Sequence, residues 1–287
     1  MSSTDRTEPL RILIGCDTFA PDVNGAARFT ERLAAGLVAR GHRVFIVAPS
    51  QKYRRTPPRT EVIEGQPMTV YRLPAVRWLP HDWLRFVWPW RSKHYARRVL
   101  GAVQPDVVHI QSHIVIGRGL ARIARQRRIP IVATNHVMAE NILDFTVMPP
   151  FIDQLVLKLA WDDAERTFKM ARAVTTPTRR AADFLERTVD LKGVIPISCG
   201  IDRANYRPDP EPRDRSRLLF VGRLTSEKRV DVTLRAIARI VDEHRPAEGS
   251  ALDLRFDIVG GGDQRKHLEH LVERLGLQDR VTFHGRV

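Results

Sequence analysis

The chain has 287 residues, which is enough for two ordinary domains with a buried core and excludes a peptide or a fold that depends on disulfides. With 43% hydrophobic and 28% charged residues and no glycine or proline tract, its composition is that of a globular protein and not of a disordered one. Lysine and arginine exceed aspartate and glutamate by 14, and residues 43–128 alone hold 17 basic and 4 acidic residues.

This clustered positive charge indicates an anionic partner: a membrane surface, nucleic acid or phosphorylated substrates. Genomic bias toward arginine explains the choice of arginine over lysine better than it explains the clustering. Cys16 and Cys199 are too few and too far apart for a disulfide framework or a zinc site, which fits a reducing compartment. The first ten residues lack the apolar core of a signal peptide, and no later run approaches the ~20 apolar residues of a spanning helix. We therefore predict a cytoplasmic protein whose membrane contact is peripheral.

Short apolar runs alternate with amphipathic segments over the first 200 residues. Strands are predicted at residues 11–15, 44–48, 68–73, 106–111, 130–134 and 173–176, and helices at residues 26–40, 91–103, 117–127, 150–170 and 178–187. Strands that are apolar throughout and separated by helices indicate a parallel sheet covered on both faces. After a polar tail at 1–10, residues 11–200 are therefore expected to form a complete Rossmann-like α/β domain.

A second alternating unit follows a segment rich in proline and charge, which is typical of an interdomain linker and is placed at residues 201–216. Strands at 218–221, 254–259 and 281–283 and helices at 230–243 and 264–275 are predicted beyond it. Three strands make half of a doubly wound nucleotide-binding domain. Residues 217–287 are therefore expected to form an incomplete Rossmann-like domain.

The loop between the first strand and the first helix contains Gly25. Ligands of open parallel sheets bind beyond the carboxyl ends of the strands, and a glycine before a helix lets backbone N–H groups approach an anion or a sugar. An ordinary turn residue is the alternative interpretation of a lone glycine. The sequence contains neither G-x-G-x-x-G at this loop nor a P-loop motif, which argues against nicotinamide binding and against a P-loop nucleotidase.

A second candidate binding motif is the segment LLFVGRLTSEKRVD at residues 218–231. Gly222 follows a buried strand, and Arg223 and Lys228 flank a short loop in which Thr225 and Ser226 are candidate helix caps. A guanidinium fork and an ammonium at a helix N-terminus suit a diphosphate. A solvated basic loop is the alternative, but the position just past a strand end favours the diphosphate.

Seven segments appear in an order that resembles the family-4, GT-B-type retaining glycosyltransferases. They are PDVNGAARFTERLAAGLVARGHRVFIVAP, DVVHIQSHIVIG, IPIVATNH, VTTPT, ISCGID, LLFVGRLTSEKRVD and FDIVGGGD, and the resemblance runs from Arg11 to Val287. It implies a GT-B-like α/β fold in which the first domain binds the acceptor and the second binds a nucleotide-diphosphate sugar.

The resemblance also implies roles for individual residues. Gly25 would contact the donor, Arg223 and Lys228 would hold the diphosphate and stabilise the leaving group without a required metal, and His136 would face the transferred sugar. A lone histidine such as His136 is otherwise more often structural than catalytic.

Further contacts follow from the same matching positions. Gly222 and Gly261 would approach the nucleotide, although close backbone packing explains a glycine-rich turn equally well. Asp22, Asn24 and His113 would lie on the acceptor side.

Members of that family carry two glutamates, eight positions apart, beyond the position that matches Val287. These residues hold the donor sugar and ribose, so we expect this chain alone to have little or no transferase activity. The alternative function is a catalytically inactive fragment that binds an acceptor or a membrane.

Four of the five tryptophans lie within 13 residues and alternate with arginines. Trp78, Trp83, Arg85, Trp88 and Trp90 are expected to contact a membrane, because tryptophan suits the headgroup zone and each nearby cation contributes ~1 kcal/mol with acidic lipid. The alternative is that these rings fill the core below the acceptor site.

The sequence therefore predicts a hexosyltransferase that moves mannose or glucose, with retention, from GDP-mannose or UDP-glucose to a lipid-linked or glycolipid acceptor at the inner face of the cell membrane. It is expected to need no cofactor and no metal. Nucleic-acid binding is a competing hypothesis that no recognition motif supports. The sugar, the base and the acceptor are left open, and no oligomeric state is predicted.

Overall fold

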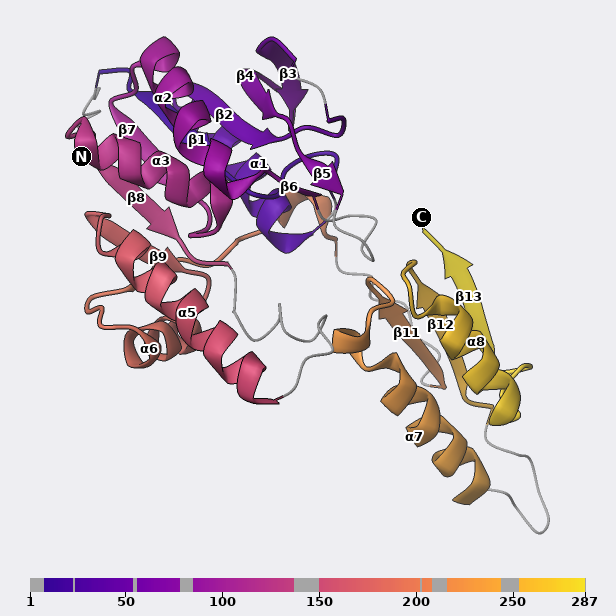
Figure 1. Cartoon of the computed structure of the whole chain (residues 1–287). Coiled ribbons are helices and arrows are strands. Elements are labelled where there is room, and N and C mark those ends of the chain that lie inside the picture. Colours follow the sequence, from indigo (N-terminus) through magenta and orange to yellow (C-terminus); the bar gives the residue numbers. More distant parts are fainter. Residues whose placement is uncertain are drawn as a thin grey trace, which may run out of the picture. The chain divides into compact units, whose positions relative to one another are not determined.

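The chain divides into two units, Met1–Ile201 and Asp202–Val287, each built around its own parallel sheet (Figure 1). The computed structural model describes residues 8–22, 24–53, 56–77, 85–136, 150–201, 203–207, 216–243 and 253–286.

The first unit contains an eight-stranded sheet in the order β10-β9-β8-β7-β1-β2-β4-β3. All neighbours pair in parallel except β3, which is antiparallel to β4. The strands are β1 (Arg11–Gly15), β2 (Arg43–Pro49), β3 (Arg59–Ile63), β4 (Gln66–Leu73), β7 (Val107–Ile110), β8 (Ile131–Thr134), β9 (Ala173–Thr176) and β10 (Ile195–Pro196). A separate two-stranded ribbon joins β5 (Val76–Arg77) to β6 (Arg85–Phe86).

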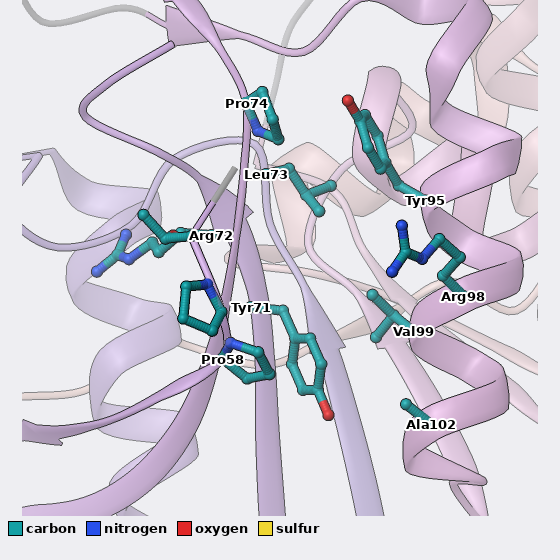
Figure 2. A pocket seen from close by; sticks show the side chains of 11 residues that line it. Pro58, Tyr71, Arg72, Leu73, Pro74, Tyr95, Arg98, Val99 and Ala102 are labelled. Carbon is teal, nitrogen blue, oxygen red and sulfur yellow. The ribbon is translucent and has the colours of Figure 1, made fainter. Parts of the chain in front are cut away.

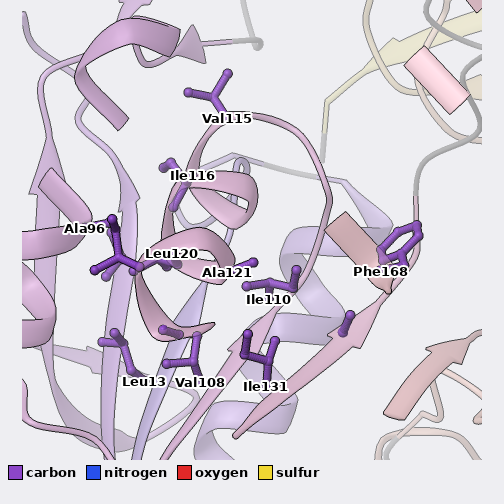
Figure 3. Close-up of a cluster of buried hydrophobic side chains, with 14 of the residues drawn as sticks. Leu13, Ala96, Val108, Ile110, Val115, Ile116, Leu120, Ala121, Ile131 and Phe168 are labelled. Atoms are coloured by element: carbon purple, nitrogen blue, oxygen red, sulfur yellow. The ribbon is translucent and has the colours of Figure 1, made fainter. Parts of the chain in front are cut away.

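Helices cover both faces of this sheet. They are α1 (Gly25–Ala39), the 3-10 turn η1 (Pro89–Arg91), α2 (Ser92–Val103), α3 (Val115–Gln126), α5 (Pro150–Phe168) and α6 (Arg179–Thr188). One core cluster joins Leu13 and Val108 to α2, α3 and α5, and Figure 3 shows Leu120 and Ala121 of α3 over these strands. A second cluster lies on the opposite face, where Ile14 packs with α1. Apolar residues on both faces explain why the strands read as continuous apolar runs.

Two glycines let α3 lie close to the sheet. A Cβ on Gly15 would come within 2.2 Å of the Leu120 side chain, and one on Gly117 within 1.8 Å of the Ser112 carbonyl oxygen. A larger residue at Gly117 would push α3 away from the end of β7, which carries part of the candidate site, whereas a larger residue at Gly15 would require the Leu120 side chain to move.

The second unit has a three-stranded parallel sheet, β11-β12-β13, among its described residues. Its elements are η2 (Arg203–Asn205), β11 (Arg217–Val221), η3 (Ser226–Lys228), α7 (Val230–Glu243), β12 (Arg255–Val259), α8 (Arg265–Arg274) and β13 (Val281–Gly285). Leu224, Leu234 and Ile258 are buried in its core.

The α/β class with parallel sheets is confirmed, and every helix and strand predicted above is present with small shifts at its ends. Sequence reasoning missed β3, β10 and the β5–β6 ribbon. The sequence of β3, RTEVI, is not a continuous apolar run, because most of its residues are exposed at the edge of the sheet.

Candidate functional site

Asp17 ties the loop after β1 to the start of α3. Its carboxylate accepts hydrogen bonds from the Ser112 hydroxyl and, at 2.9 Å, from the N–H of Ile116. Burial raises the pKa of Asp17, while these hydrogen bonds act in the opposite direction. Since β1 and β7 are neighbours in the sheet, this tie fixes two loops at the carboxyl edge. The sequence analysis assigned no role to Asp17.

Asn24 and Gly25 begin α1. The Asn24 side-chain oxygen accepts from the N–H of Ala27 at 2.9 Å and from the Thr18 hydroxyl at 3.3 Å, which caps the helix. Its Nδ2 is buried with no hydrogen-bond partner among the described residues. A Cβ on Gly25 would meet nothing within 4 Å, and Gly25 is not among the glycines with positive φ. Neither strain nor packing therefore requires a glycine here, which weakens the turn-residue interpretation.

Asp22 lies beside the end of β2, where its carboxylate accepts from Nε2 of Gln51 at 3.3 Å. Burial raises the pKa of Asp22, and the Gln51 hydrogen bond and the charge of Arg85 oppose that shift. The side chain is half-buried at the carboxyl edge, so it is accessible in part. Its contact with an acceptor stays a prediction.

His136 follows β8 and is held by a residue that the sequence analysis did not select. The Gln111 amide oxygen, at the end of β7, accepts from Nε2 of His136 at 3.1 Å, and the Phe29 ring lies 4.7 Å from the imidazole. Burial lowers the pKa of His136 to about 4, so the ring is neutral at pH 7. With its proton on Nε2, the ring has Nδ1 as its acceptor. Gln111 is 3% exposed, and its Nε2 has no hydrogen-bond partner among the described residues.

A polar chain crosses three strands next to this pair. Nε2 of His109 lies 2.8 Å from the Thr134 hydroxyl, which lies 2.8 Å from the Thr175 hydroxyl. Burial, and then the charge of His136, lower the pKa of His109 to about 4. These neutral hydrogen bonds connect β7, β8 and β9 through their side chains.

His113 lies in a buried, aromatic environment. It is 5% exposed and its ring lies against Trp161 and Phe168, with centroid distances of 6.5 and 5.5 Å. Burial lowers its pKa to about 4. The imidazole packs in the aromatic core, and its contact with an acceptor stays a prediction.

In the second unit, Glu227 lies between the two predicted diphosphate ligands. Its Oε1 accepts from Nη2 of Arg223 at 3.2 Å, lies 3.6 Å from Nζ of Lys228, and is 3.4 Å from the Thr225 hydroxyl. Thr225 precedes η3 without making the predicted capping hydrogen bond, because its hydroxyl contacts Glu227 instead. The sequence analysis did not select Glu227, although its position four residues after an arginine was a visible signal.

The glycine-rich turn after β12 packs on the backbone of residues 222–224. A Cβ on Gly260 would lie 1.8 Å from the Gly222 oxygen, and one on Gly262 would lie 2.2 Å from the Leu224 oxygen. Steric packing therefore accounts for these two glycines. A Cβ on Gly261 would meet only the Arg286 side chain, at 3.6 Å. Gly261 is thus the glycine of this turn that packing does not explain.

The predicted membrane segment begins outside the described residues, where Trp78 and Trp83 lie. Arg85 and Trp88 are half-buried, whereas Trp90 is 68% exposed. The rings of Trp88 and Trp90 stack with centroids 4.6 Å apart. The exposed Trp90 ring does not fill a core, which argues against the alternative interpretation at that position.

The described residues contain neither a metal-binding cluster nor a membrane-spanning helix. No three His, Cys, Asp or Glu side chains gather closely enough there to hold a metal ion. No described helix has the length and the apolar character needed to cross a membrane.

Two family models match the chain. Residues 23–205 match the description "Glycosyltransferase Family 4", and residues 202–287 match "Glycosyl transferases group 1". A GDP-mannose-dependent alpha-mannosyltransferase of Corynebacterium glutamicum is 25% identical over 92% of this chain. An alpha-monoglucosyldiacylglycerol synthase of Streptococcus pneumoniae is 25% identical over 97% of this chain. The matches span 60% and 62% of the lengths of these relatives.

The fold also resembles a solved structure. Sucrose-phosphate synthase from Thermosynechococcus elongatus superposes with a TM-score of 0.68 at 17% identity, covering 96% of this chain and 70% of that one. At this identity the likeness concerns the fold alone.

Proposed function

The chain belongs to the GT-B glycosyltransferases of family 4, and on that basis we propose that it serves the transfer of a hexose, mannose or glucose, from a nucleotide-diphosphate sugar to a lipid-linked or glycolipid acceptor. The names of the two relatives, a mannosyltransferase that depends on GDP-mannose and a synthase of a glucosylated diacylglycerol, support this range of donors and acceptors. Retention of anomeric configuration is part of the proposal and follows from the resemblance.

The Arg223–Glu227–Lys228 cluster is the observation that carries the proposal. Arg223 follows β11 and Lys228 ends η3, and the hydrogen bond of Arg223 and the ion pair of Lys228 join both side chains to one carboxylate. A diphosphate would add acceptor oxygens that both cations can bind, with Arg223 as a planar fork and Lys228 as a point charge. In the transfer step these charges would stabilise the negative charge that develops on the departing diphosphate.

His136 is proposed to contact the transferred sugar. A neutral imidazole whose Nε2 donates to Gln111 presents Nδ1 as an acceptor for a hydroxyl group. Because the ring remains neutral well below pH 7, its role is to position the sugar by a hydrogen bond and not to supply a charge. Gly25, beside the helix N-terminus of α1, is proposed to let the donor approach the backbone.

The acceptor is proposed to reach the first unit from an acidic membrane surface, at the inner face of the cell membrane. Trp90 is exposed and stacks with Trp88, and the adjoining helix α2 contains basic residues and no acidic ones. This combination suits contact with acidic headgroups.

Calorimetric titration of the whole chain with GDP and with UDP tests the donor site. Arg223→Gln should weaken binding of the preferred nucleotide by roughly tenfold or more, because a hydrogen bond to a charged group contributes about 1.5–3 kcal/mol. Arg229→Gln is the matched control, since Arg229 is exposed and pairs with Asp231 at 3.4 Å. Equal affinities of the two variants would refute the assignment of Arg223.

The sugar contact is tested by calorimetric titration of the whole chain with GDP-mannose and UDP-glucose beside GDP and UDP, because the chain alone is expected to have little or no transferase activity. His136→Ala should weaken binding of the nucleotide sugar more than binding of the nucleotide, because this residue is proposed to contact the sugar and not the diphosphate. Equal losses of affinity for the nucleotide sugar and for the nucleotide would contradict this role.

A further inference from the structure

A cavity of about 220 Å³ lies between β4 and α2, on the sheet face that α2 and α3 cover. Tyr71 and Leu73 form its wall on β4, and Val99 and Ala102 form the opposite wall on the helix. Pro58 lines it as well, as Figure 2 shows. Apart from Thr56 and the arginine and tyrosine groups, the lining side chains are apolar, so the cavity suits a hydrocarbon chain better than a sugar.

An open hollow of about 520 Å³ continues this cavity toward the start of α2. The two spaces share Pro74, Tyr95 and Arg98, and the hollow adds Arg91, His94 and Tyr53 to its lining. Figure 2 shows Tyr95 and Arg98 on the helix, facing the strand across the cavity. An apolar slot therefore opens into a mouth whose polar side chains are arginine, tyrosine and histidine.

The mouth has positive charge that the described carboxylates do not neutralise. Neither Arg91 nor Arg98 has a carboxylate within ion-pair distance among the described residues, and α2 itself contains no acidic residue. Tyr95 is hydrogen-bonded to Arg91, which orients this guanidinium at the entrance. Arginine forks of this kind bind phosphate oxygens.

We propose that this cavity and hollow bind one anionic lipid, with a hydrocarbon chain between β4 and α2 and its phosphate at Arg91 and Arg98. A free phosphate would leave the apolar slot unused, and a zwitterionic lipid would bring a second cation to a mouth that is already positive. An anionic lipid satisfies both parts of the site.

This lipid site is separate from the residues proposed for sugar transfer. Its lining comes from Tyr53, residues 56–58, β4 and its neighbour Pro74, Arg91 and α2. Gly25, Gln111 and His136, in contrast, lie beyond the ends of β1, β7 and β8. The proposal depends only on contacts within the first unit, so it can fail or hold independently of the transfer reaction.

The test is a calorimetric titration of the whole chain with dihexanoyl phosphatidic acid, kept below its micelle concentration. Glycerol 3-phosphate supplies the headgroup without chains, and dihexanoyl phosphatidylcholine supplies the chains with a zwitterionic headgroup. Arg98→Gln removes one arginine of the mouth, and Arg97→Gln is the matched control with the same change of charge at an exposed neighbour that does not line the site. Ala102→Trp, at an exposed position on the cavity wall, fills the slot.

We expect phosphatidic acid to bind about tenfold more tightly than either comparison compound, and Arg98→Gln to lose about tenfold while Arg97→Gln stays within about twofold. Ala102→Trp should reduce affinity for phosphatidic acid to that for glycerol 3-phosphate, with an unchanged circular dichroism melting temperature. Equal losses in Arg97→Gln and Arg98→Gln would show general surface attraction and overturn the proposal. So would equal affinity for glycerol 3-phosphate and phosphatidic acid in the unaltered chain, or unchanged lipid binding by Ala102→Trp.

Discussion

Replacing His113 with phenylalanine should make the first unit less sensitive to acid. Burial lowers the pKa of His113 from 6.5 to about 4, so its ring is neutral in the folded chain while the unfolded chain takes up a proton near pH 6.5. Between these two pH values the unfolded state binds more protons than the folded state. The free energy of unfolding therefore decreases as pH falls. His113→Phe removes this proton and its share of the pH dependence.

The size of the effect follows from the two pKa values. A single group with pKa values of 6.5 unfolded and about 4 folded costs roughly 2 kcal/mol of stability between pH 7 and pH 5, and roughly 3 kcal/mol by pH 4. Asp163 raises this pKa and Arg118 lowers it. These two residues form an ion pair at 2.8 Å, so their effects oppose each other and burial is the largest cause of the shift. Phenylalanine is larger than histidine and can add packing strain, but that cost is the same at every pH.

Urea unfolding followed by tryptophan fluorescence measures this difference. All five tryptophans precede residue 202, so the signal reports the first unit. The stability of His113→Phe relative to the unaltered chain should rise by about 2 kcal/mol from pH 7 to pH 5. His113→Leu, which differs in size but also cannot titrate, should show the same change. A relative stability that is equal at both pH values would refute the reasoning.

Three further changes test other parts of the molecule. Gln111→Glu places a carboxylate beside Nε2 of His136 and should raise the pKa of that imidazole by about 1–3 units, measured by NMR titration of its ring protons; an unchanged pKa would contradict the contact. Gly260 has φ +142°, and a Cβ there would lie 1.8 Å from the Gly222 carbonyl oxygen. Gly260→Ala should therefore lower the free energy of unfolding of the second unit, measured by hydrogen exchange, by about 3 kcal/mol or more, whereas Gly261→Ala should lower it by less than about 1 kcal/mol. Trp90→Ala should lower flotation with acidic vesicles severalfold and leave urea unfolding unchanged, and equal flotation of both proteins would argue against a membrane role.

Parallel strands such as β1 and β2 could be predicted because both of their faces are buried. The edge hairpin of β3 and β4 could not be recognised by this criterion, since most of β3 faces solvent. Its signal was local instead: Glu64 and Gly65, between the two strands, both have positive φ, which is the backbone of a tight hairpin turn. A search for turn residues, and not for apolar runs, would have found this strand.

The candidate site was predictable where function depends on position along the chain. Arg223 and Lys228 could be selected because they follow a strand end. Gln111 could not, because its partner lies 25 residues away and the contact exists only when β7 and β8 are paired. The tie from Asp17 to Ser112 spans 95 residues and needs the neighbouring positions of β1 and β7. Residues proposed to bind a ligand are thus easier to find from the sequence than the residues that orient them.

The distribution of ion pairs sets helix α2 apart from other helices of both units. Arg179 in the first unit and Arg235 and Arg265 in the second pair with carboxylates four residues away, an arrangement that stabilises a helix by about 0.2–0.5 kcal/mol per pair. Helix α2 contains no acidic residue, and Lys93 and Arg97 are like charges at the same spacing, which costs a similar amount. Genomic bias toward arginine acts on all of these helices and does not by itself produce this difference. An anionic partner can, because it supplies from outside the negative charge that the helix lacks.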